Sequence, residues 1–242
     1  MPNPTAAALI IGDEILTGRT REGNGHFLAG VLAQTGIDLK EIRVIGDDHA
    51  TIVAAVRELA AGHDHLFTSG GIGPTHDDIT ADAVADAFGA TISIRDDAYA
   101  ILAAHYATTG MEFNAARQRM ARIPAGARLI DNPVSAAPGF SLGNTYVMAG
   151  VPNIFQAMVA SVLPTLTGGK PLISLSLRVM QAESSVAQAF GALAARMPDI
   201  SMGSYPFVKD GAYGTNLVVR GTDAARVEAG HAQLRALFPE GQ

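Results

Sequence analysis

Three predicted strands constrain this fold most strongly, because each is followed by a loop and then by apolar residues at helical spacing. They span residues 6–11, 39–45 and 65–68. The first is a continuous apolar run, which is typical of a strand that is buried on both faces of a sheet. The helices predicted after them end at Gly36, Gly62 and Gly89. Alternation of strand and helix at this spacing predicts a mainly parallel sheet with helices on both faces.

The chain between residues 90 and 165 is less regular and adds antiparallel structure. The dipeptide Gly143-Asn144 separates two short apolar runs, which predicts a two-residue β-hairpin. Pro152 is suited to the first turn of a helix. Further helices are expected over 96–109, from a cap at Asn114 to Met120, and over 153–163, and strands over 127–130, 139–142 and 145–148.

A stretch rich in Gly and Pro at 167–171 is the best candidate for a linker. We expect residues 1–168 to form a three-layer αβα domain of the α/β class, and residues 171–242 to form a small α+β subdomain. A unit this short is marginal alone, so we expect it to pack on the first domain or on a second subunit. Its pattern is β-α-β-β-α, with strands over 172–179, 201–205 and 215–219 and helices over 184–196 and 223–237.

Composition excludes several classes of function. The chain has no cysteine, which excludes disulfides, thiolate metal sites and cysteine nucleophiles. Its formal net charge is -6, so no general basic field favours nucleic acid or anionic lipid. The N-terminus has no basic segment, and no apolar run reaches the length of a membrane span. We therefore expect a cytoplasmic protein that contacts neither nucleic acid nor membrane.

The strongest candidate for a functional site is the segment from Gly70 to Thr80, which follows the third predicted strand. Ligands of open α/β sheets bind at this carboxyl end of the strands. Glycines let the backbone approach a ligand closely, and free N–H groups at the start of the following helix favour an anion. The pattern is neither a Walker loop nor Gly-x-Gly-x-x-Gly. The candidate phosphate-binding residues are Ser69, Gly70, Gly71, Gly73, Pro74, Thr75 and Thr80.

Two adjacent carboxylates in this segment, Asp77 and Asp78, complicate a phosphate site because bare carboxylates repel phosphate. A divalent cation such as Mg²⁺ between the carboxylates and the phosphate would remove the conflict. Alternatively, one aspartate acts as a general base or orients a water molecule. A purely structural alternative is that one of them caps the following helix.

Other polar clusters follow the neighbouring strands and are expected at the same edge of the sheet. Asp47 is a candidate ligand or catalytic residue, whereas its neighbour Asp48 is suited to cap a helix. Asn24 is either a helix cap or a ligand contact. The segments 133–140 and 149–152 either set turns or place backbone against the ligand. The candidates from these clusters are Gly12, Asp13, Glu14, Asn24, Asp47, Gly139, Gly150 and Pro152.

Taken together, these motifs resemble the signature of the MoaB/Mog family of molybdopterin-binding domains. The segment 70–80 carries the resemblance most strongly, and the motifs at 12–16, 24, 46–47, 133–139 and 150–152 fall where the family has motifs. Within the family, the chain is most similar to the N-terminal part of the competence/damage-inducible protein CinA and to the molybdopterin-binding-like domain of FAD synthases. The segment Gly203-Ser204-Tyr205-Pro206 resembles part of the small second subdomain of CinA-like chains.

The resemblance implies one of two chemistries. In the molybdenum-cofactor branch, similar domains bind the pterin phosphate and can adenylylate it with Mg²⁺ and ATP. In the CinA and FAD-synthase branch, similar domains hydrolyse a pyrophosphate in ADP-ribose-like or FAD-like molecules, using a divalent metal. The Thr75-His76-Asp77-Asp78 sequence and the C-terminal segment 171–242 resemble the second branch more closely. The acidic positions that match the family's metal chemistry are Asp47 and Asp78.

We therefore expect a metal-dependent nucleotide pyrophosphatase that binds a phosphate-bearing small molecule. Its catalytic residues would be Asp47, Asp77 and Asp78, and Asp47 and Asp78 would hold an ion such as Mg²⁺. By analogy with the relatives, we also expect a homo-oligomer. Two alternatives remain open: binding or adenylylation of molybdopterin, and a ligand-binding module without catalysis.

Overall fold

The computed structural model describes residues 2–242 and divides into two compact units, with the boundary between Gly169 and Lys170. This boundary lies inside the stretch that the sequence marks as a linker. Each unit has its own hydrophobic core, so the two are described separately. Within residues 2–242, no helix is both long and apolar enough to cross a bilayer.

The first unit alternates strands and helices over its first half and becomes more irregular after α4. Its elements are β1 (Thr5–Ile11), α1 (Asp13–Leu16), α2 (Asn24–Thr35), β2 (Asp38–Ile45), α3 (His49–Gly62), β3 (His65–Ser69), α4 (Thr80–Phe88), β4 (Ile92–Ile94), α5 (Asp96–Thr109), α6 (Ala115–Gln118), η1 (Arg119–Ala121), β5 (Arg122–Pro124), β6 (Arg128–Ile130), β7 (Gly139–Leu142), β8 (Thr145–Met148), α7 (Pro152–Val162) and η2 (Leu163–Thr165).

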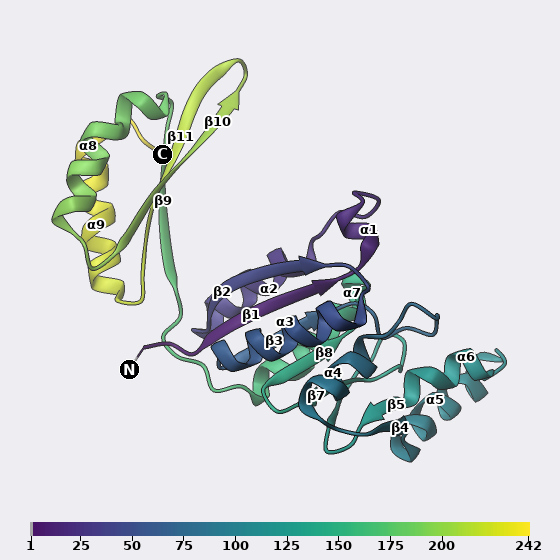
Figure 1. Ribbon diagram of the computed structural model, residues 1–242. Coiled ribbons are helices and arrows are strands. Elements are labelled where there is room, and N and C mark those ends of the chain that lie inside the picture. The colour runs from purple at the N-terminus through teal and green to yellow at the C-terminus, as the bar shows by residue number, and fades with distance from the viewer. Residues whose placement is uncertain (1) are drawn as a thin grey trace. The chain divides into compact units, whose positions relative to one another are not determined.

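The central sheet of this unit has six strands in the order β2-β1-β3-β8-β7-β6 (Figure 1). Strands β2, β1, β3 and β8 run parallel to one another, whereas β7 and β6 are antiparallel to their neighbours. The hairpin from β7 to β8 turns at Gly143-Asn144, as the sequence predicts. The expected mostly parallel sheet with an antiparallel hairpin is confirmed.

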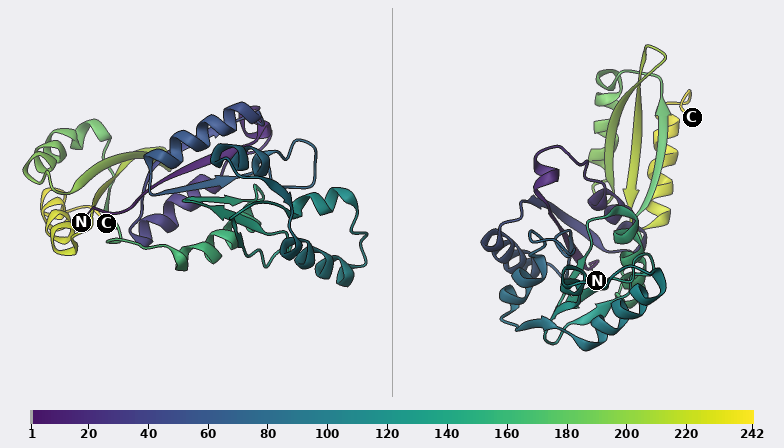
Figure 2. Two further views of the ribbon diagram at one scale, coloured as in Figure 1. Left: turned by 60° about the horizontal axis from the view of Figure 1, so that its bottom comes forward. Right: turned by 90° about the vertical axis from the view of Figure 1, so that its right-hand side faces the viewer.

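Helices cover both faces of this sheet, as the left view of Figure 2 shows. Side chains of β1 alternate between two cores because successive residues of a strand point to opposite faces. Ala7 and Leu9 belong to a core that includes apolar residues of α3, α4 and α5. Ala6 and Ala8 belong to a core that includes residues of α2 and α7. The predicted three-layer αβα arrangement is therefore correct.

The strand order places a topological switch point beside β1. From β1 the chain passes through α2 to β2 on one side, and then through α3 to β3 on the other side. Open α/β sheets bind ligands outside the carboxyl ends of the strands at such a point. The segments that leave β1, β2 and β3 there begin at Gly12, Gly46 and Gly70.

Several short elements of this unit have no counterpart in the sequence-based prediction. Among them are β4 and β5, which form a small antiparallel sheet and are each only three residues long, and the single turn α1. Elements this short contain too few residues to show a hydrophobic period. The predicted caps Asp48 and Asn114 are confirmed, since their side chains accept hydrogen bonds from the N–H groups of Thr51 and Arg117.

The second unit is a three-stranded antiparallel sheet in the order β10-β11-β9, with two helices packed on one face (Figure 1). The expected small α+β subdomain is present, but its hairpin is longer than predicted. The strands continue to a turn at Asp210-Gly211, where both residues have positive φ, as in the tight turns that fit twisted hairpins. Its elements are β9 (Ile173–Val179), α8 (Glu183–Arg196), β10 (Ser201–Lys209), β11 (Ala212–Gly221) and α9 (Ala224–Leu237).

Candidate functional site

A cavity of about 510 Å³ lies where the segments after β1, β2, β3 and β8 meet. A volume of this size suits a small organic ligand. Motifs that lie far apart in the sequence therefore share one site, at the edge of the sheet that the strand-end rule predicts. The lining residues are Ile11, Gly12, Glu14, Thr20, Asp47, Gly70, Gly71, Ile72, Gly73, Pro74, Asp77, Asp78, Met120, Asn132, Ser135, Ala137, Ala149, Gly150, Val151, Pro152 and Ile154.

The two glycines that follow β3 shape the cavity through their backbone. Gly70 and Gly71 have φ values of 109° and 69°, a region that favours glycine. A Cβ atom on Gly70 would lie 2.1 Å from the carbonyl oxygen of Ile11, and one on Gly71 would lie 2.1 Å from Oγ1 of Thr80. Both positions thus require the absence of a side chain, and the chain turns tightly at the centre of the site.

A buried amide holds the ends of β3 and β8 together beside these glycines. Nδ2 of Asn24, on α2, donates to Oγ of Ser69 and to the carbonyl oxygen of Gly150, each at 2.8 Å. Asn24 is only 6% exposed, so losing these bonds would leave polar atoms buried. A Cβ atom on Gly150 would approach the Cα of Gly70 to 3.2 Å. We call Asn24, Ser69, Gly70 and Gly150 the strand-end junction.

Four carboxylates line the same cavity: Glu14, Asp47, Asp77 and Asp78. We call them the acidic wall. Burial raises the pKa of Asp47; the hydrogen bond that Asp47 accepts from the Asp13 N–H lowers it, and the carboxylates of Asp13, Glu14 and Asp77 raise it. None of the lining residues within the described chain is Lys, Arg or His. An anionic ligand in this cavity would therefore need a cation to offset the acidic wall.

The carboxylate of Asp78 orders the loop rather than capping the next helix. Its Oδ2 accepts hydrogen bonds from the N–H and the hydroxyl of Thr75, at 2.8 and 2.5 Å. Helix α4 begins later, and its N-cap residue Ile79 makes no side-chain cap. The alternative in which Asp77 or Asp78 caps this helix is thus wrong. His76 points to solvent with its side chain 99% exposed.

The start of α4 also differs from the expected anion site. The N–H of Thr80 donates to the carbonyl oxygen of Gly71 at 2.9 Å, and Thr80 is fully buried. This N–H is therefore already used, and the helix start does not line the cavity. The loop backbone between Gly70 and Asp78 faces the ligand space instead.

Six of the predicted binding residues do not line the cavity: Asp13, Asn24, Ser69, Thr75, Thr80 and Gly139. Asn24 and Ser69 belong to the strand-end junction, and Asn24 is the first residue of α2 rather than its cap. Gly139 packs inside the sheet, where a Cβ atom would lie 2.4 Å from the carbonyl oxygen of Val147. Thr75 lies outside the lining and donates two hydrogen bonds to Asp78, which does line the cavity. The other predicted site residues all line the cavity.

No group of three His, Cys, Asp or Glu residues is arranged to hold a metal ion anywhere in residues 2–242. The chain by itself therefore offers an incomplete ligand set. This fits Mg²⁺ in one respect, because Mg²⁺ is commonly held by one or two carboxylates together with substrate phosphates and water. The raised pKa of Asp47 among neighbouring carboxylates is the electrostatic situation that a cation would relieve.

The structure adds residues that the sequence reasoning missed. Asn132 is 3% exposed, and its side chain bonds Ser135 and the backbone of Val134 and Ala137, which fixes the turn on one side of the cavity. The Asn-Pro dipeptide was the available signal for this turn.

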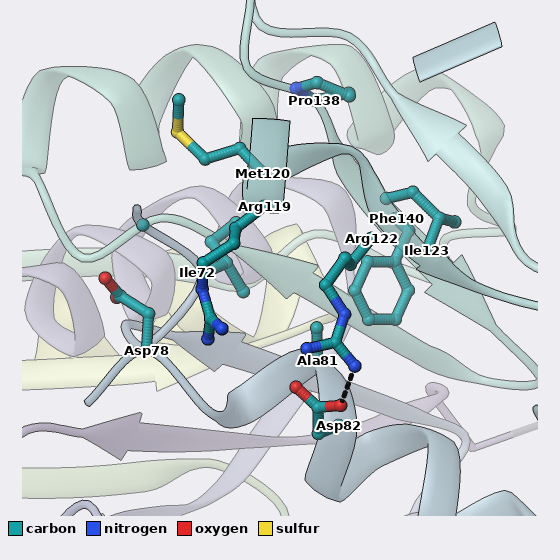
Figure 3. Close-up of a pocket in the computed structure, with 11 residues that line it drawn as sticks. Ile72, Asp78, Ala81, Asp82, Arg119, Met120, Arg122, Ile123, Pro138 and Phe140 are labelled. Carbon is teal, nitrogen blue, oxygen red and sulfur yellow. Dashed lines mark hydrogen bonds and ion pairs between the residues drawn. The ribbon is translucent and has the colours of Figure 1, made fainter. Parts of the chain in front are cut away.

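A second, narrow pocket adjoins the cavity through Ile72, Gly73, Asp78 and Met120. Arg119 and Arg122 line this pocket close to the loop (Figure 3).

Comparison with known protein families agrees with this geometry. Residues 7–168 match the family model described as a probable molybdopterin binding domain. The chain belongs to this molybdopterin-binding domain family. Residues 171–242 match a second model, described as the middle domain of FAD synthase. The resemblance to the MoaB/Mog family, to CinA and to FAD synthase is confirmed.

Individual relatives follow the same division. A probable FAD synthase of Caenorhabditis elegans is 30% identical over 97% of this chain and 50% of its own length. A CinA-like protein of Geobacter metallireducens is 40% identical over 56% of this chain and 33% of its own. The chain thus spans half or less of the length of these relatives. The crystal structure of CinA from Thermoplasma acidophilum, a protein of unknown function, covers 66% of this chain and 98% of its own, with TM-score 0.61 and 33% identity.

Proposed function

We propose that this protein is a metal-dependent pyrophosphatase that cleaves the diphosphate of a dinucleotide-like molecule such as ADP-ribose or FAD. The observation that carries the proposal is the joining of the glycine turn and the acidic wall in one cavity of about 510 Å³. Backbone at Gly70 and Gly71 gives close approach to phosphate. Carboxylates supply ligands for a cation and a base for water.

The residues suited to hold the metal are Asp47 and Asp78, with Glu14 and Asp77 in the same wall. When bound, a divalent ion would neutralise charge on the phosphates and make a water molecule a better nucleophile. Asp78 retains Oδ1 for such a role, because Oδ2 is occupied by Thr75. Ligands missing from the chain would come from the substrate, so metal and substrate should bind together.

The protein's own groups would divide the remaining work. The loop from Gly70 to Gly73 orients the diphosphate along its backbone. Asp77, whose side chain is 62% exposed, would accept a proton from the attacking water. Apolar lining residues such as Ile72, Met120 and Ile154 offer a surface for a base or ring.

The choice of a dinucleotide-like substrate is supported by the second unit. Its match to the middle domain of FAD synthase, together with the similarity to a probable FAD synthase over 97% of this chain, points to FAD-like molecules. The test is incubation of the purified protein with ADP-ribose or FAD and Mg²⁺, Mn²⁺ or Co²⁺, followed by chromatography of the nucleotides. We expect AMP as a product, and none after EDTA. Folded protein that cleaves neither substrate with any of these metals would reject the proposal.

Molybdopterin binding is a second candidate, favoured by the family model that covers residues 7–168. The same glycine turn would then bind the pterin phosphate, and the apolar lining would contact the pterin. Purification under anaerobic conditions followed by oxidation and fluorescence would detect a bound pterin. Stoichiometric pterin fluorescence without nucleotide cleavage would favour this function over the first.

A further inference from the structure

The charged side chains that line the cavity are all acidic, so a bound phosphate would need a positively charged group from elsewhere. Four carboxylates and no basic side chain are among the residues that line it. A metal ion would offset part of this charge. A diphosphate brings further negative charge, so a cationic side chain within reach of the same wall would lower the cost of binding.

Two arginines lie in the narrow pocket that adjoins the cavity, whose free volume is only about 20 Å³. This pocket is too small for a phosphate, so it serves to hold side chains. Figure 3 shows Arg119 lying between Asp78 and Arg122. The pocket and the cavity share Gly73 and Asp78, so Arg119 borders the same loop residues that line the ligand space.

The two arginines differ in their partners. Arg122 forms an ion pair with Asp82 at 2.5 Å, which fixes its guanidinium on α4. The side chain of Arg119 makes no hydrogen bond or ion pair within residues 2–242, and its Nε is buried without a partner. A buried guanidinium nitrogen without a partner is costly and rare, so the side chain of Arg119 is not held in place by polar contacts of its own.

The position of Arg119 follows from the local fold. Helix η1 (Arg119–Ala121) connects α6 to β5, and Ala121 is fully buried in the first core. This anchor sets the chain so that the neighbouring Met120 lines both the pocket and the cavity. Arg119 therefore lies one residue from a cavity-lining side chain, on a segment held by packing rather than on a free loop.

We propose that Arg119 binds a phosphate oxygen of the ligand on the Gly73–Asp78 side of the cavity. This inference rests on the proposed phosphate-bearing ligand. A guanidinium suits the role because its planar N–H groups match two phosphate oxygens at once. The terminal nitrogens of the guanidinium would meet the phosphate where the pocket opens to the cavity at Gly73 and Asp78, and the charge of Arg119 would offset part of the acidic wall.

The experiment compares Arg119→Gln, Arg119→Lys and the control Arg117→Gln. Arg117 lies two residues earlier, where its guanidinium donates to the Glu112 carbonyl oxygen and stacks 4.9 Å from the Tyr106 ring centroid. Calorimetry would measure the Kd of inorganic pyrophosphate, ADP-ribose and uncharged adenosine, each with Mg²⁺. Steady-state kinetics would give KM and kcat for ADP-ribose, and thermal unfolding would report folding.

We expect Arg119→Gln to weaken pyrophosphate and ADP-ribose binding by about 10- to 100-fold, the effect of one charged hydrogen bond. Adenosine binding should stay unchanged. Arg119→Lys should recover part of the affinity because it keeps a point charge, and Arg117→Gln should stay within about twofold of the unchanged protein. Equal pyrophosphate affinity in Arg119→Gln and the unchanged protein, or an equal loss for adenosine, would overturn the inference.

The result also separates this inference from the proposed activity. Pyrophosphate binding that depends on Arg119, with no cleavage of ADP-ribose or FAD, would reject the pyrophosphatase and keep the Arg119 site. Cleavage of ADP-ribose with an unchanged KM in Arg119→Gln would keep the pyrophosphatase and reject the Arg119 site. An unchanged protein that binds neither pyrophosphate nor ADP-ribose would reject both.

Discussion

The strand-end junction and the acidic wall line or support the same cavity, yet they are built in opposite ways. In the junction, Asn24, Ser69 and Gly70 are buried and fixed by hydrogen bonds or close backbone contacts. In the wall, Glu14 and Asp77 are exposed, and Asp47 and Asp78 are half-buried. The shape of this site therefore comes from backbone and amide packing, whereas its charge comes from side chains that are partly or largely open to solvent, of which Asp78 also orders the loop.

The largest effect should come from the junction, with Gly70→Ala. The new Cβ would meet the Ile11 carbonyl oxygen at 2.1 Å, at a φ of 109° that alanine tolerates poorly. We expect a loss of about 4 kcal/mol in the free energy of unfolding, measured by urea titration. Gly110→Ala is the control, because its φ of 69° is also positive but no atom lies within 4 Å of an added Cβ; it should cost about 1 kcal/mol. Equal losses would show that steric contact at Gly70 is unimportant.

In the acidic wall, Asp47→Asn should lower activity and leave stability unchanged. We expect metal-dependent cleavage of ADP-ribose to fall by about 100-fold, or ~3 kcal/mol in activation free energy, with an unchanged melting temperature. The amide oxygen can still accept the hydrogen bond from the Asp13 N–H. Asp48→Asn, at the next residue, keeps the helix cap and should keep full activity. A lower melting temperature with normal activity per folded molecule would show that Asp47 stabilises the fold and does not take part in catalysis.

A medium effect on stability is expected from Asn24→Ala. The change removes both hydrogen bonds of the buried amide and leaves the Ser69 and Gly150 acceptors without it. We expect a loss of about 2 kcal/mol in unfolding free energy. Asn153→Ala, at an exposed position of α7, should change it by less than about 0.5 kcal/mol. Substrate affinity should also fall in Asn24→Ala, since the junction shapes the cavity. An unchanged affinity would show that the hydrogen bonds of Asn24 are not needed for ligand binding.

The smallest effect concerns Asp48, which neighbours the wall but has a structural role. The hydrogen bonds from Thr51 hold the pKa of Asp48 below its ordinary value. Its stabilising contribution is therefore complete above the usual carboxyl pKa of about 3.9 and is lost as the pH falls through the lowered value. Asp48→Ala should lower the melting temperature by about 3 °C at pH 7 and by less at pH 3. An equally large difference at pH 3 would contradict a role for the charged cap.

Much of the fold could be predicted because its strands and helices have clear hydrophobic periods. β1 is buried along almost its whole length, and the sequence shows it as an unbroken apolar run. β4, β5 and α1 were missed because three or four residues carry no period. The second hairpin was predicted too short because its outer residues, such as Val208 and Tyr213, are exposed, and exposed strand residues show no core-facing pattern.

The site was predicted in outline because strand ends in a parallel sheet meet at one edge. This rule located Gly12, Asp47, Gly70 and Gly150 at one cavity. The roles within the site depend on three-dimensional contacts that no local pattern contains. Asn24 was ambiguous for that reason. Arg119 could not be singled out because tertiary packing brings it to the pocket that Gly73 and Asp78 also line, more than forty residues earlier in the chain.

The two hydrogen bonds of the Asn24 side chain couple ligand binding to the stability of the first unit. The amide of Asn24 joins residues that lie 45 and 126 positions away along the chain. The pocket therefore exists only when α2, β3 and β8 are assembled at the same time, and partly unfolded forms of the first unit cannot bind. A ligand at a hundredfold excess over its Kd would then raise the global unfolding free energy of that unit by about 2.7 kcal/mol. Ligand screening by thermal shift becomes a direct route to the natural substrate.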